Sequence, residues 1–445
     1  MVTVQKKVVN PKSVIDDSPI GAFRSGVYLI CYLIIMLDIY HALAMGFAAP
    51  FIVKEWGVGN VVLGPVLSAA VVGMGIGGLL VGPLIERTSP KAVAIGATVC
   101  FGFFGLITST STSVGMLILW RTLTGIGLGA ALPTASAILF DFAPSKRASL
   151  LMTLSAVPSG IAAIGCGFIA GYVAPTHGWP WIFVAGGVGA IVVAAAAILF
   201  LSEPVQFLVA RGAPDHVVAS ILAKVDRSID PAISTFAGPV ETGAPAKGST
   251  TRQILSPYWF RTTLLLWLAT VAILAIFYAA SGWLPLIISQ AGHGVKAAAT
   301  MSTALLLGGM VGSIIIGFMM DRTDKTLVAA GAFFLAGISA FLVGLALSNP
   351  AALIVLLFLL GCSLYGGTAA LVPLAAATYP AEARPTGISL MYSVGRIGGI
   401  AGPICVGLVM ARYGGGATAL AFMGTVSIIA AATFGLFKKF GRAPG

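Results

Sequence analysis

Long apolar stretches separated by short polar ones dominate the pattern along this chain. An α-helix needs about 20 consecutive, mostly apolar residues to cross the hydrocarbon core of a bilayer, and the chain contains twelve such stretches. Inside a bilayer the backbone has no water to bind, so each stretch is predicted to be a helix. The predicted spans are residues 26–53, 60–84, 92–112, 114–140, 149–174, 180–201, 261–289, 298–320, 327–348, 351–378, 386–410 and 416–437.

One long polar interruption divides the predicted helices into six and six. It covers residues 202–259, which are rich in Pro, Gly, Ser, Asp and Lys, and within it residues 213–225 have the periodicity of a short amphipathic surface helix. The predicted units are an N-terminal tail (1–25), a first six-helix bundle (26–201), a central loop (202–259), a second six-helix bundle (260–437) and a C-terminal tail (438–445).

The two halves also repeat each other. The segment GPLIERTSPK, which begins at Gly82, has a counterpart GFMMDRTDKT that begins at Gly317. In the same way PSKR, ending at Arg147, corresponds to PAEAR, ending at Arg384, at nearly the same offset. Both pairs lie in corresponding loops, which indicates a duplication that produced two parallel halves.

Composition and charge agree with a membrane location. Of the 445 residues, 58% are hydrophobic and only 9% are charged, and the mean hydropathy is +1.01; soluble domains carry roughly 25% charged residues. Most of the 25 Lys and Arg residues fall in loops and tails that share one side with both termini, and the positive-inside rule places that side in the cytoplasm. The net charge of +11 therefore reflects topology, and no nucleic-acid partner is predicted.

Other general signals are weak. The polar N-terminal segment lacks the short apolar core and the cleavage site of a signal peptide, so a cytoplasmic tail is expected. Each of the five cysteines lies alone in a different predicted helix, without the Cys or His spacing of a metal site. We predict neither a metal nor a disulfide framework, and no group of nucleophile, base and orienting residue indicates an enzyme.

Four ionisable residues lie inside predicted spans, namely Asp38 and His41 in the first, Arg121 in the fourth and Arg396 in the eleventh. A charge at the bilayer centre costs about 2.5–3.5 kcal/mol on insertion scales, so such residues are rare and usually functional. At about 1.5 Å per residue, Asp38, Arg121 and Arg396 lie near mid-membrane, where transporters of repeat architecture bind their substrates. The corresponding positions of the other half are uncharged, which argues against a role in folding a six-helix unit.

Two guanidinium groups and one carboxylate in a dry cavity leave a positive surplus, which favours an organic anion. Aromatic residues on the helices expected to line this cavity are suited to stacking on a planar ring. They are Tyr40, Phe47, Phe277, Tyr278, Trp283, Tyr365 and Tyr392. Each assignment has a structural alternative: ion pairing for the acid and the arginines, an interior hydrogen bond for His41, and packing for the aromatic residues.

Charged residues at the inner ends of the predicted helices suit a cytoplasmic gate. Exposed pairs contribute only ~0–1 kcal/mol each, but that is enough to bias a near-balanced equilibrium between two states. The candidates are Glu86, Arg87, Asp141, Arg147, Asp321, Arg322, Glu382 and Arg384. The alternative is that these charges only determine topology.

Glycines spaced by four in two predicted helices, Gly73 with Gly77 and Gly308 with Gly312, do not lie between a strand and a helix as phosphate-binding loops do. Close helix packing is the expected reason for them.

Several of these motifs resemble those of a known superfamily. The loop from Gly82 through Glu86 and Arg87, and its repeat, resemble the signature loop of the major facilitator superfamily, with Glu86 where the superfamily usually has Asp. RTLTGIGLGAALP, beginning at Arg121, is similar to its Arg-then-glycines motif. The resemblance implies an all-α membrane protein with twelve transmembrane helices in two pseudo-symmetric six-helix bundles. It also implies that helices 2, 5, 8 and 11 meet between the halves, where smooth glycine surfaces would let them rock.

A narrower resemblance concerns two helices. LDIYHALAMGFAAPFIVKEWGV resembles the first helix of the aromatic acid/proton symporters, and EARPTGISLMYSVGRIGGIAGP resembles their helix 11. The chain departs from that family at His41, where the family has a second acid, and at Ile39, where it has Gly. The resemblance implies proton-coupled uptake of a small aromatic carboxylic acid, such as a benzoate or hydroxybenzoate, across a bacterial inner membrane.

We therefore predict a multi-pass secondary transporter that works by alternating access. Asp38 and His41 are assigned to proton coupling, and Arg121 and Arg396 to the substrate carboxylate. The expected partners are a small aromatic carboxylate, protons and the lipid bilayer; no cofactor other than the coupling proton is expected, and the protein is expected to be a monomer. The alternatives are a symporter for another organic anion, a drug/proton antiporter of the same superfamily, and, from a different class, a non-transporting membrane receptor.

Overall fold

Helices dominate the computed structural model of the chain, which describes residues 7–148, 151, 154–226, 234–236, 249–380 and 383–440. The N-terminal half contains α2 (Ala22–Trp56), α3 (Asn60–Arg87), α4 (Pro90–Thr108), α5 (Val114–Phe142), α7 (Ala156–Phe168) with its continuation η2 (Ile169–Val173) and α8 (Ala174–His177), and α9 (Pro180–Phe200). The C-terminal half contains α13 (Pro257–Ile288), α14 (Gly294–Arg322), α15 (Lys325–Leu345), α16 (Pro350–Leu360) with η4 (Gly361–Tyr365), α17 (Gly366–Thr368) and α18 (Leu371–Thr378), α19 (Arg384–Tyr413) and α20 (Gly416–Phe440).

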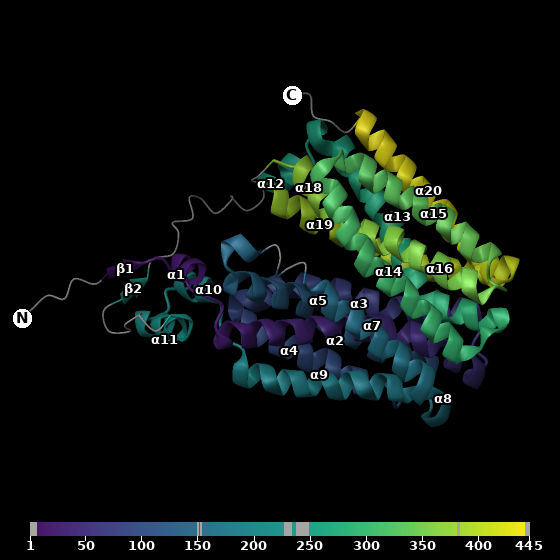
Figure 1. Cartoon of the computed structure of the whole chain (residues 1–445), viewed down its shortest axis with the longest axis horizontal. Helices are drawn as coiled ribbons and strands as arrows, with labels where there is room; N and C mark the ends of the chain where they lie inside the picture. The colour runs from purple at the N-terminus through teal and green to yellow at the C-terminus, as the bar shows by residue number, and fades with distance from the viewer. Residues whose placement is uncertain are drawn as a thin grey trace, which may run out of the picture.

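Among the described residues, 11 helical segments are long and apolar enough to cross a membrane, and one of them, Pro257–Arg322, is 66 residues long. That segment makes two crossings, because its helix is interrupted at Gly292 (φ 96°), and Gly294 (φ 71°) also has a conformation that favours glycine. The described residues therefore contain the twelve predicted spans, and the all-α fold class with two six-helix bundles is confirmed (Figure 1).

Local sequence signals set where the helices begin. Ser113 accepts a hydrogen bond from the backbone amide of Met116 at the start of α5, and Asp324 does so from Thr326 and Leu327 at the start of α15. These side chains satisfy amide groups that have no partner inside the helix. The short loops between spans are thereby held in defined positions.

The paired glycines bring helices into close contact within each half. A Cβ atom at Gly73 would lie 2.0 Å from the carbonyl oxygen of Thr122 on α5, and one at Gly308 would lie 2.1 Å from that of Phe358 on α16. Close packing is thus the correct interpretation of these glycines. The expectation that they form a sliding surface between the halves is wrong, because both pairs face helices of their own half.

We call the membrane face where α2 begins and α20 ends the termini face, and the other the far face. The halves contact each other through α2 with α13, α3 with α19, and α7 with α14. Near the far face, Ser68 Oγ on α3 donates to the carbonyl of Ile400 on α19 at 2.7 Å, and a Cβ at Gly46 would lie 2.3 Å from the carbonyl oxygen of Ser281. In Figure 1 the halves diverge toward the side that carries α10 and α12.

Short elements from the predicted tail and central loop pack together on the termini face. The strand β1 (Lys7–Val9) pairs in parallel with β2 (Ser234–Phe236), and α1 (Pro11–Asp17) contacts α10 (Val205–Ala210) and α11 (Asp215–Val225). The predicted helix at 213–225 is thus confirmed as α11, and α12 (Ser249–Ile254) precedes α13. The bundles also begin earlier than predicted, at Ala22 and Pro257.

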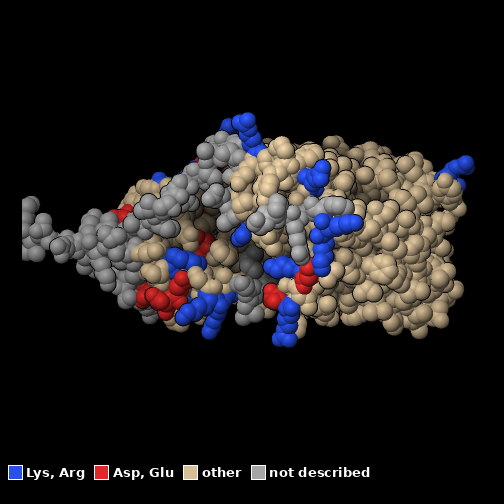
Figure 2. Space-filling view, turned by 90° about the horizontal axis from the view of Figure 1, so that it is seen from above, with Lys and Arg blue, Asp and Glu red and all other residues tan. Residues whose placement is uncertain are grey.

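Contacts with the first bundle hold α1 in place. Asp16 of α1 accepts hydrogen bonds from the backbone amide and hydroxyl of Ser145, at 2.7 and 2.8 Å. Arg24 is buried and donates to the carbonyl of Ile15 at 2.8 Å. Basic side chains gather over this end of the molecule, and much of the remaining surface in view is uncharged (Figure 2).

Candidate functional site

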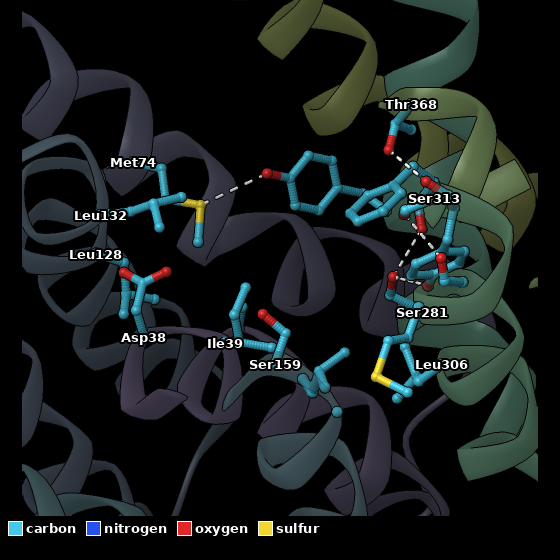
Figure 3. A pocket seen from close by; sticks show the side chains of 18 of the residues that line it. Asp38, Ile39, Met74, Leu128, Leu132, Ser159, Ser281, Leu306, Ser313 and Thr368 are labelled. Atoms are coloured by element: carbon cyan, nitrogen blue, oxygen red, sulfur yellow. Dashed lines mark hydrogen bonds between the residues drawn. The ribbon is translucent and has the colours of Figure 1, made fainter. Parts of the chain in front are cut away.

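A cavity of about 390 Å³ lies between the two halves, within the size range of small-molecule sites. The N-terminal half lines it with residues of α2, α3, α5 and α7, and the C-terminal half with residues of α13, α14, η4, α17 and α19. Figure 3 shows Asp38, Ile39 and Met74 on one side, with Ser281, Ser313 and Thr368 on the other. Both halves thus contribute side chains to one site.

Two charged residues, Asp38 and Arg396, face this cavity among its described lining residues. Asp38 is only 3% exposed, and its Oδ1 has no hydrogen-bond partner among the described residues. Arg396 reaches the cavity from α19, in the opposite half. The two charges balance when Asp38 is ionised, and one positive charge remains when Asp38 is protonated.

A glycine of the N-terminal half makes room for Arg396. A Cβ atom at Gly78 would lie 2.3 Å from Nη1, 3.1 Å from Cζ and 3.1 Å from Nη2 of Arg396. The guanidinium group therefore lies against the backbone of α3, where any side chain would displace it. Gly75, one turn away on the same helix, has open space at the corresponding position.

Aromatic and hydroxyl side chains form much of the C-terminal wall. The rings of Phe277 and Tyr365 lie 4.4 Å apart and are inclined by 41°, and the Tyr365 hydroxyl is hydrogen-bonded to Ser281 Oγ. The hydroxyl of Tyr278 contacts Met74 Sδ across the halves at 3.7 Å (Figure 3). Three of the predicted aromatic residues, Phe277, Tyr278 and Tyr365, therefore line the cavity.

Arg121 is not among the lining residues, in contrast to the predicted pair of cavity arginines. It is 1% exposed and lies within the N-terminal half, where its Nη2 donates to the carbonyl of His41 at 2.8 Å and its Cζ lies 5.6 Å from the centre of the Phe183 ring. The cavity face of α5 is formed instead by the segment from Leu128 to Pro133. The structure thus gives Arg121 a position behind α2, away from the cavity.

His41 also lies outside the cavity. It is fully buried, its ring is 5.3 Å from that of Phe101, and it fills the space left by Gly105 on α4. Three helical residues correspond to about 300° of rotation, which is a net offset of about 60°, and with this offset His41 points into the interior of the half while Asp38 faces the cavity. The expectation that the two side chains act on the same face is therefore not met.

The remaining predicted aromatic contacts are placed elsewhere. Tyr40 donates to the carbonyl of Ile182 at 2.8 Å, and Trp283 donates to that of Pro403 at 2.9 Å; both are buried. Phe47 lines a much smaller neighbouring void, and Tyr392 is absent from the described lining of the cavity. Packing is the role that this arrangement supports for these four residues.

Three of the predicted gate residues make contacts that do not join the two halves. Asp141 Oδ2 accepts from the amide of Val205 at 2.8 Å, the backbone of Glu86 accepts from Arg211, and Arg322 lies 3.9 Å from the Phe318 ring centre. Two ion pairs among the described residues are Lys12 with Asp16 and Lys438 with Asp324, and neither joins the halves. Glu382 lies outside the described residues, and the gate roles of Glu86, Arg87, Asp141, Arg147, Asp321, Arg322 and Arg384 stay predictions.

The sequence analysis missed the hydroxyl residues of the cavity wall, namely Ser159, Ser281, Ser313 and Thr368. A signal for one of them was present, because Ser281 follows Phe277 by four residues and therefore lies on the same helix face. The signal was weak, since serine and threonine are common in membrane helices at helix contacts.

Comparison with known proteins identifies the family. The family model of the Major Facilitator Superfamily matches residues 28–373 and 296–444. This chain belongs to the Major Facilitator Superfamily. It is a multi-pass membrane transporter by family and by its apolar helices.

Individual relatives cover nearly the whole chain. The 4-hydroxybenzoate transporter PcaK of Pseudomonas putida is 35% identical over 396 residues, which are 89% of this chain and 88% of that protein. A gallate transporter of the same species is 33% identical over 404 residues, 90% of this chain and 89% of that protein. The structure of the xylose transporter XylE of E. coli, in a partially occluded inward open conformation, is similar with a TM-score of 0.72 and 14% sequence identity. The match covers 95% of this chain and 100% of that one, so the two proteins share the fold.

Proposed function

We propose that this protein imports a small aromatic carboxylic acid, of the benzoate or hydroxybenzoate type, together with protons, by alternating access. The observation that carries the proposal is the presence of one guanidinium group and one carboxyl group, from opposite halves, in a single cavity with aromatic walls. The relatives named above as carriers of 4-hydroxybenzoate and gallate support the substrate class.

Arg396 is proposed to bind the substrate carboxylate. Guanidinium is a planar fork that bonds a carboxylate through two parallel hydrogen bonds, and its position against Gly78 brings it between the halves. The rings of Phe277, Tyr278 and Tyr365 are proposed to pack on the aromatic ring, which contributes about 0.5–1.5 kcal/mol per pair beyond burial. Arg121, which lies behind α2, and His41, which points from α2 into the N-terminal half, are proposed to hold that helix and to act on Asp38 through its position.

Asp38 is proposed to carry the coupling proton. When Asp38 is ionised the cavity is neutral and its negative charge opposes a second carboxylate; when it is protonated the cavity carries the single positive charge of Arg396. Substrate affinity should therefore rise as the pH falls through the range in which Asp38 takes up its proton. By linkage, bound substrate should raise the proton affinity of Asp38 by the same factor.

The orientation follows from the distribution of basic residues. Lys and Arg gather at the termini face (Figure 2), and the positive-inside rule then gives both termini a cytoplasmic location. The membrane is proposed to be a bacterial inner membrane, because the relatives named above come from bacteria. The halves touch near the far face and diverge toward the termini face (Figure 1). We propose that this is the inward-facing state and that the charged loop residues close the termini face in the outward-facing state.

The test compares ligand binding and transport by wild type and Asp38→Asn. Purified protein is titrated calorimetrically with benzoate, 4-hydroxybenzoate and hexanoate at pH 5.5 and pH 7.5, and uptake is measured in liposomes with an imposed pH gradient. We expect an aromatic acid to bind wild type more tightly at the lower pH, and Asp38→Asn to bind it with little pH dependence and without gradient-driven accumulation. Asp324→Asn, which changes an acid outside the membrane, serves as the matched control.

Three results would contradict the proposal. Unchanged pH dependence in Asp38→Asn would exclude this residue as the coupling acid. If hexanoate bound as tightly as the aromatic acids, the site would accept organic anions in general and would not be selective for aromatic acids. Binding without any uptake into liposomes would favour a membrane receptor.

A further inference from the structure

The hydroxyl groups that face the cavity share one property. There are six among the described lining residues, five of them on the C-terminal wall, and Figure 3 shows Ser281, Ser313 and Thr368 of that wall opposite Asp38. A hydroxyl group has one hydrogen to donate and two lone pairs to accept. The partners of these hydrogens therefore decide what the wall offers to a ligand.

In each of these hydroxyl groups the hydrogen is already donated to another group of the protein. Ser281 Oγ donates to the carbonyl of Phe277 at 2.7 Å, Ser313 Oγ to that of Gly309 at 2.8 Å, and Thr368 Oγ1 to that of Tyr365 at 2.6 Å. These are contacts with the preceding turn of the same helix. The three oxygens keep lone pairs but have no hydrogen left for a ligand.

The position of the Ser281 hydrogen also decides which residue is the donor in the hydrogen bond between Tyr365 and Ser281. Because the single hydrogen of Ser281 is bound to the Phe277 carbonyl, the Tyr365 hydroxyl must be the donor in their hydrogen bond. Its oxygen is thus left as an acceptor. The remaining two hydroxyls follow the pattern, since Ser159 donates to the carbonyl of Ser155 at 3.1 Å and Tyr278 donates to Met74 Sδ.

Hydrogen-bond donors and hydrogen-bond acceptors therefore lie in different parts of the cavity. Arg396 supplies donors, and the hydroxyl wall supplies only acceptors. A carboxylate, which is a pure acceptor, matches Arg396 and is repelled by lone pairs of the wall. A ligand that fills both parts carries a carboxylate at one position and a hydrogen-bond donor at another.

We propose that the Tyr365–Ser281 pair selects aromatic acids that carry a hydrogen-bond donor on the ring, a hydroxyl or an amino group, over unsubstituted acids and over acids with an acceptor-only substituent. The proposal rests on the proposed function and specifies which aromatic acids the site prefers. A site built to bond a substrate hydroxyl discriminates against analogues that lack it, because its own polar groups are then left without a partner.

The test uses a series of acids that differ at one ring position. Dissociation constants of purified wild type are measured at pH 5.5 for benzoate, 4-hydroxybenzoate, 3-hydroxybenzoate, 4-aminobenzoate and 4-methoxybenzoate. We expect at least one hydroxy or amino acid to bind about 5- to 10-fold more tightly than benzoate, from one hydrogen bond of typical net strength. The methoxy acid, which has an oxygen but no hydrogen to donate, should bind no more tightly than benzoate.

Two variants test the residues named. Tyr365→Phe keeps the ring and removes the oxygen, so the preference for donors over benzoate should fall to less than twofold. Ser281→Ala removes the acceptor of the Tyr365 hydrogen and frees that hydrogen for the cavity, so 4-methoxybenzoate should gain affinity relative to 4-hydroxybenzoate. Tyr413→Phe, the same chemical change at an exposed tyrosine of the same half, should leave the series unchanged.

The outcomes separate this proposal from the proposed function. Binding of benzoate as tight as that of every hydroxy and amino acid would overturn the donor selection and leave aromatic acid binding intact. A preference that survives in Tyr365→Phe, or that Ser281→Ala does not shift toward the methoxy acid, would overturn the assignment to this pair. Absence of binding by all five acids would overturn the proposed function itself.

Discussion

The two arginines inside the membrane lie in very different surroundings. Arg121 is enclosed within the N-terminal half, against the Phe183 ring and the backbone of His41. Arg396 lies between the halves, in the cavity, with its guanidinium against Gly78. Both residues gave the same sequence signal, a cationic residue near mid-membrane, so the signal itself does not distinguish a structural arginine from one that faces a ligand.

The difference lies in what each guanidinium group still lacks. Nε and Nη1 of Arg121 have no hydrogen-bond partner among the described protein groups, but no described cavity reaches them. Arg396 borders a cavity large enough for a small ligand. An unpaired charge next to open space is suited to bind an anion, whereas one enclosed by packed side chains is suited to hold its neighbours in place.

The largest expected effect is the loss of binding in Arg396→Gln. Hydrogen bonds to a charged group contribute about 1.5–3 kcal/mol, so the affinity for an aromatic carboxylate should fall roughly 10- to 100-fold, since 1.4 kcal/mol is tenfold. Thermal stability without ligand should change little. Calorimetric titration and thermal unfolding of the same preparation measure both quantities, and retained affinity would remove Arg396 from the site.

The second effect is the opposite behaviour of Arg121→Met. Arg121 is 1% exposed and donates to a backbone carbonyl, so its burial costs desolvation energy that Met, an apolar side chain of similar length, does not cost. We expect the dissociation constant to stay within about threefold of wild type and the melting temperature to stay equal or rise. If Arg121→Met folded but bound no substrate, Arg121 would also be required for binding, and the proposed difference between the two arginines would be wrong.

A smaller effect is expected for Gly78→Ala. The new methyl group would occupy the position of the Arg396 guanidinium, and because that group ends a flexible side chain, it should move while the fold is kept. We expect a several-fold loss of substrate affinity, about 3- to 10-fold, as one hydrogen bond of ordinary strength is weakened. Gly75→Ala, which meets no atom within 4 Å, is the control.

A double-mutant cycle sharpens this result. If Gly78 acts by positioning Arg396, then Gly78→Ala should have little further effect on affinity in the Arg396→Gln background. Additive losses would show that the methyl group acts by another route, such as the packing of α3.

The smallest effect is expected far from both arginines, at Asp16. Burial would raise the pKa of its carboxyl group, but the hydrogen bonds from Ser145 and the charge of Lys12 outweigh it and lower the pKa below 3.8. The stabilisation is therefore present above pH 3.8 and is lost as the pH falls through the folded-state pKa. Asp16→Asn should lower the melting temperature by at most about 3 °C at neutral pH, and this difference should vanish in acid, with substrate affinity unchanged throughout.

The sequence predicted the membrane spans with bounds that mostly differ by a few residues from those of the structure. It missed the ordered N-terminal segment, because β1 pairs with β2 more than two hundred residues away and Asp16 bonds to Ser145 on another loop. Such contacts depend on which surfaces meet, and three-residue strands carry too little pattern to be recognised.

For the candidate site, the sequence identified the residue types and their depth in the membrane. The tertiary structure decided in which direction each side chain points. Asp38, Arg396, Phe277, Tyr278 and Tyr365 line the cavity as predicted, whereas Arg121 and His41 face the interior of their half. Depth follows from counting residues along a helix whose ends are fixed by the bilayer. Rotation about the helix axis is set by packing against neighbouring helices.

The sequence by itself determined that this chain crosses a membrane as twelve helices in two related halves, because lipid requires long apolar segments with internally bonded backbones. Only the tertiary structure decided which of two equivalent arginines meets the cavity and which hydroxyl hydrogens are left for a ligand. The physical reason is that apolar length is a local property of the chain, whereas the direction and hydrogen-bonding state of a side chain depend on the atoms that surround it.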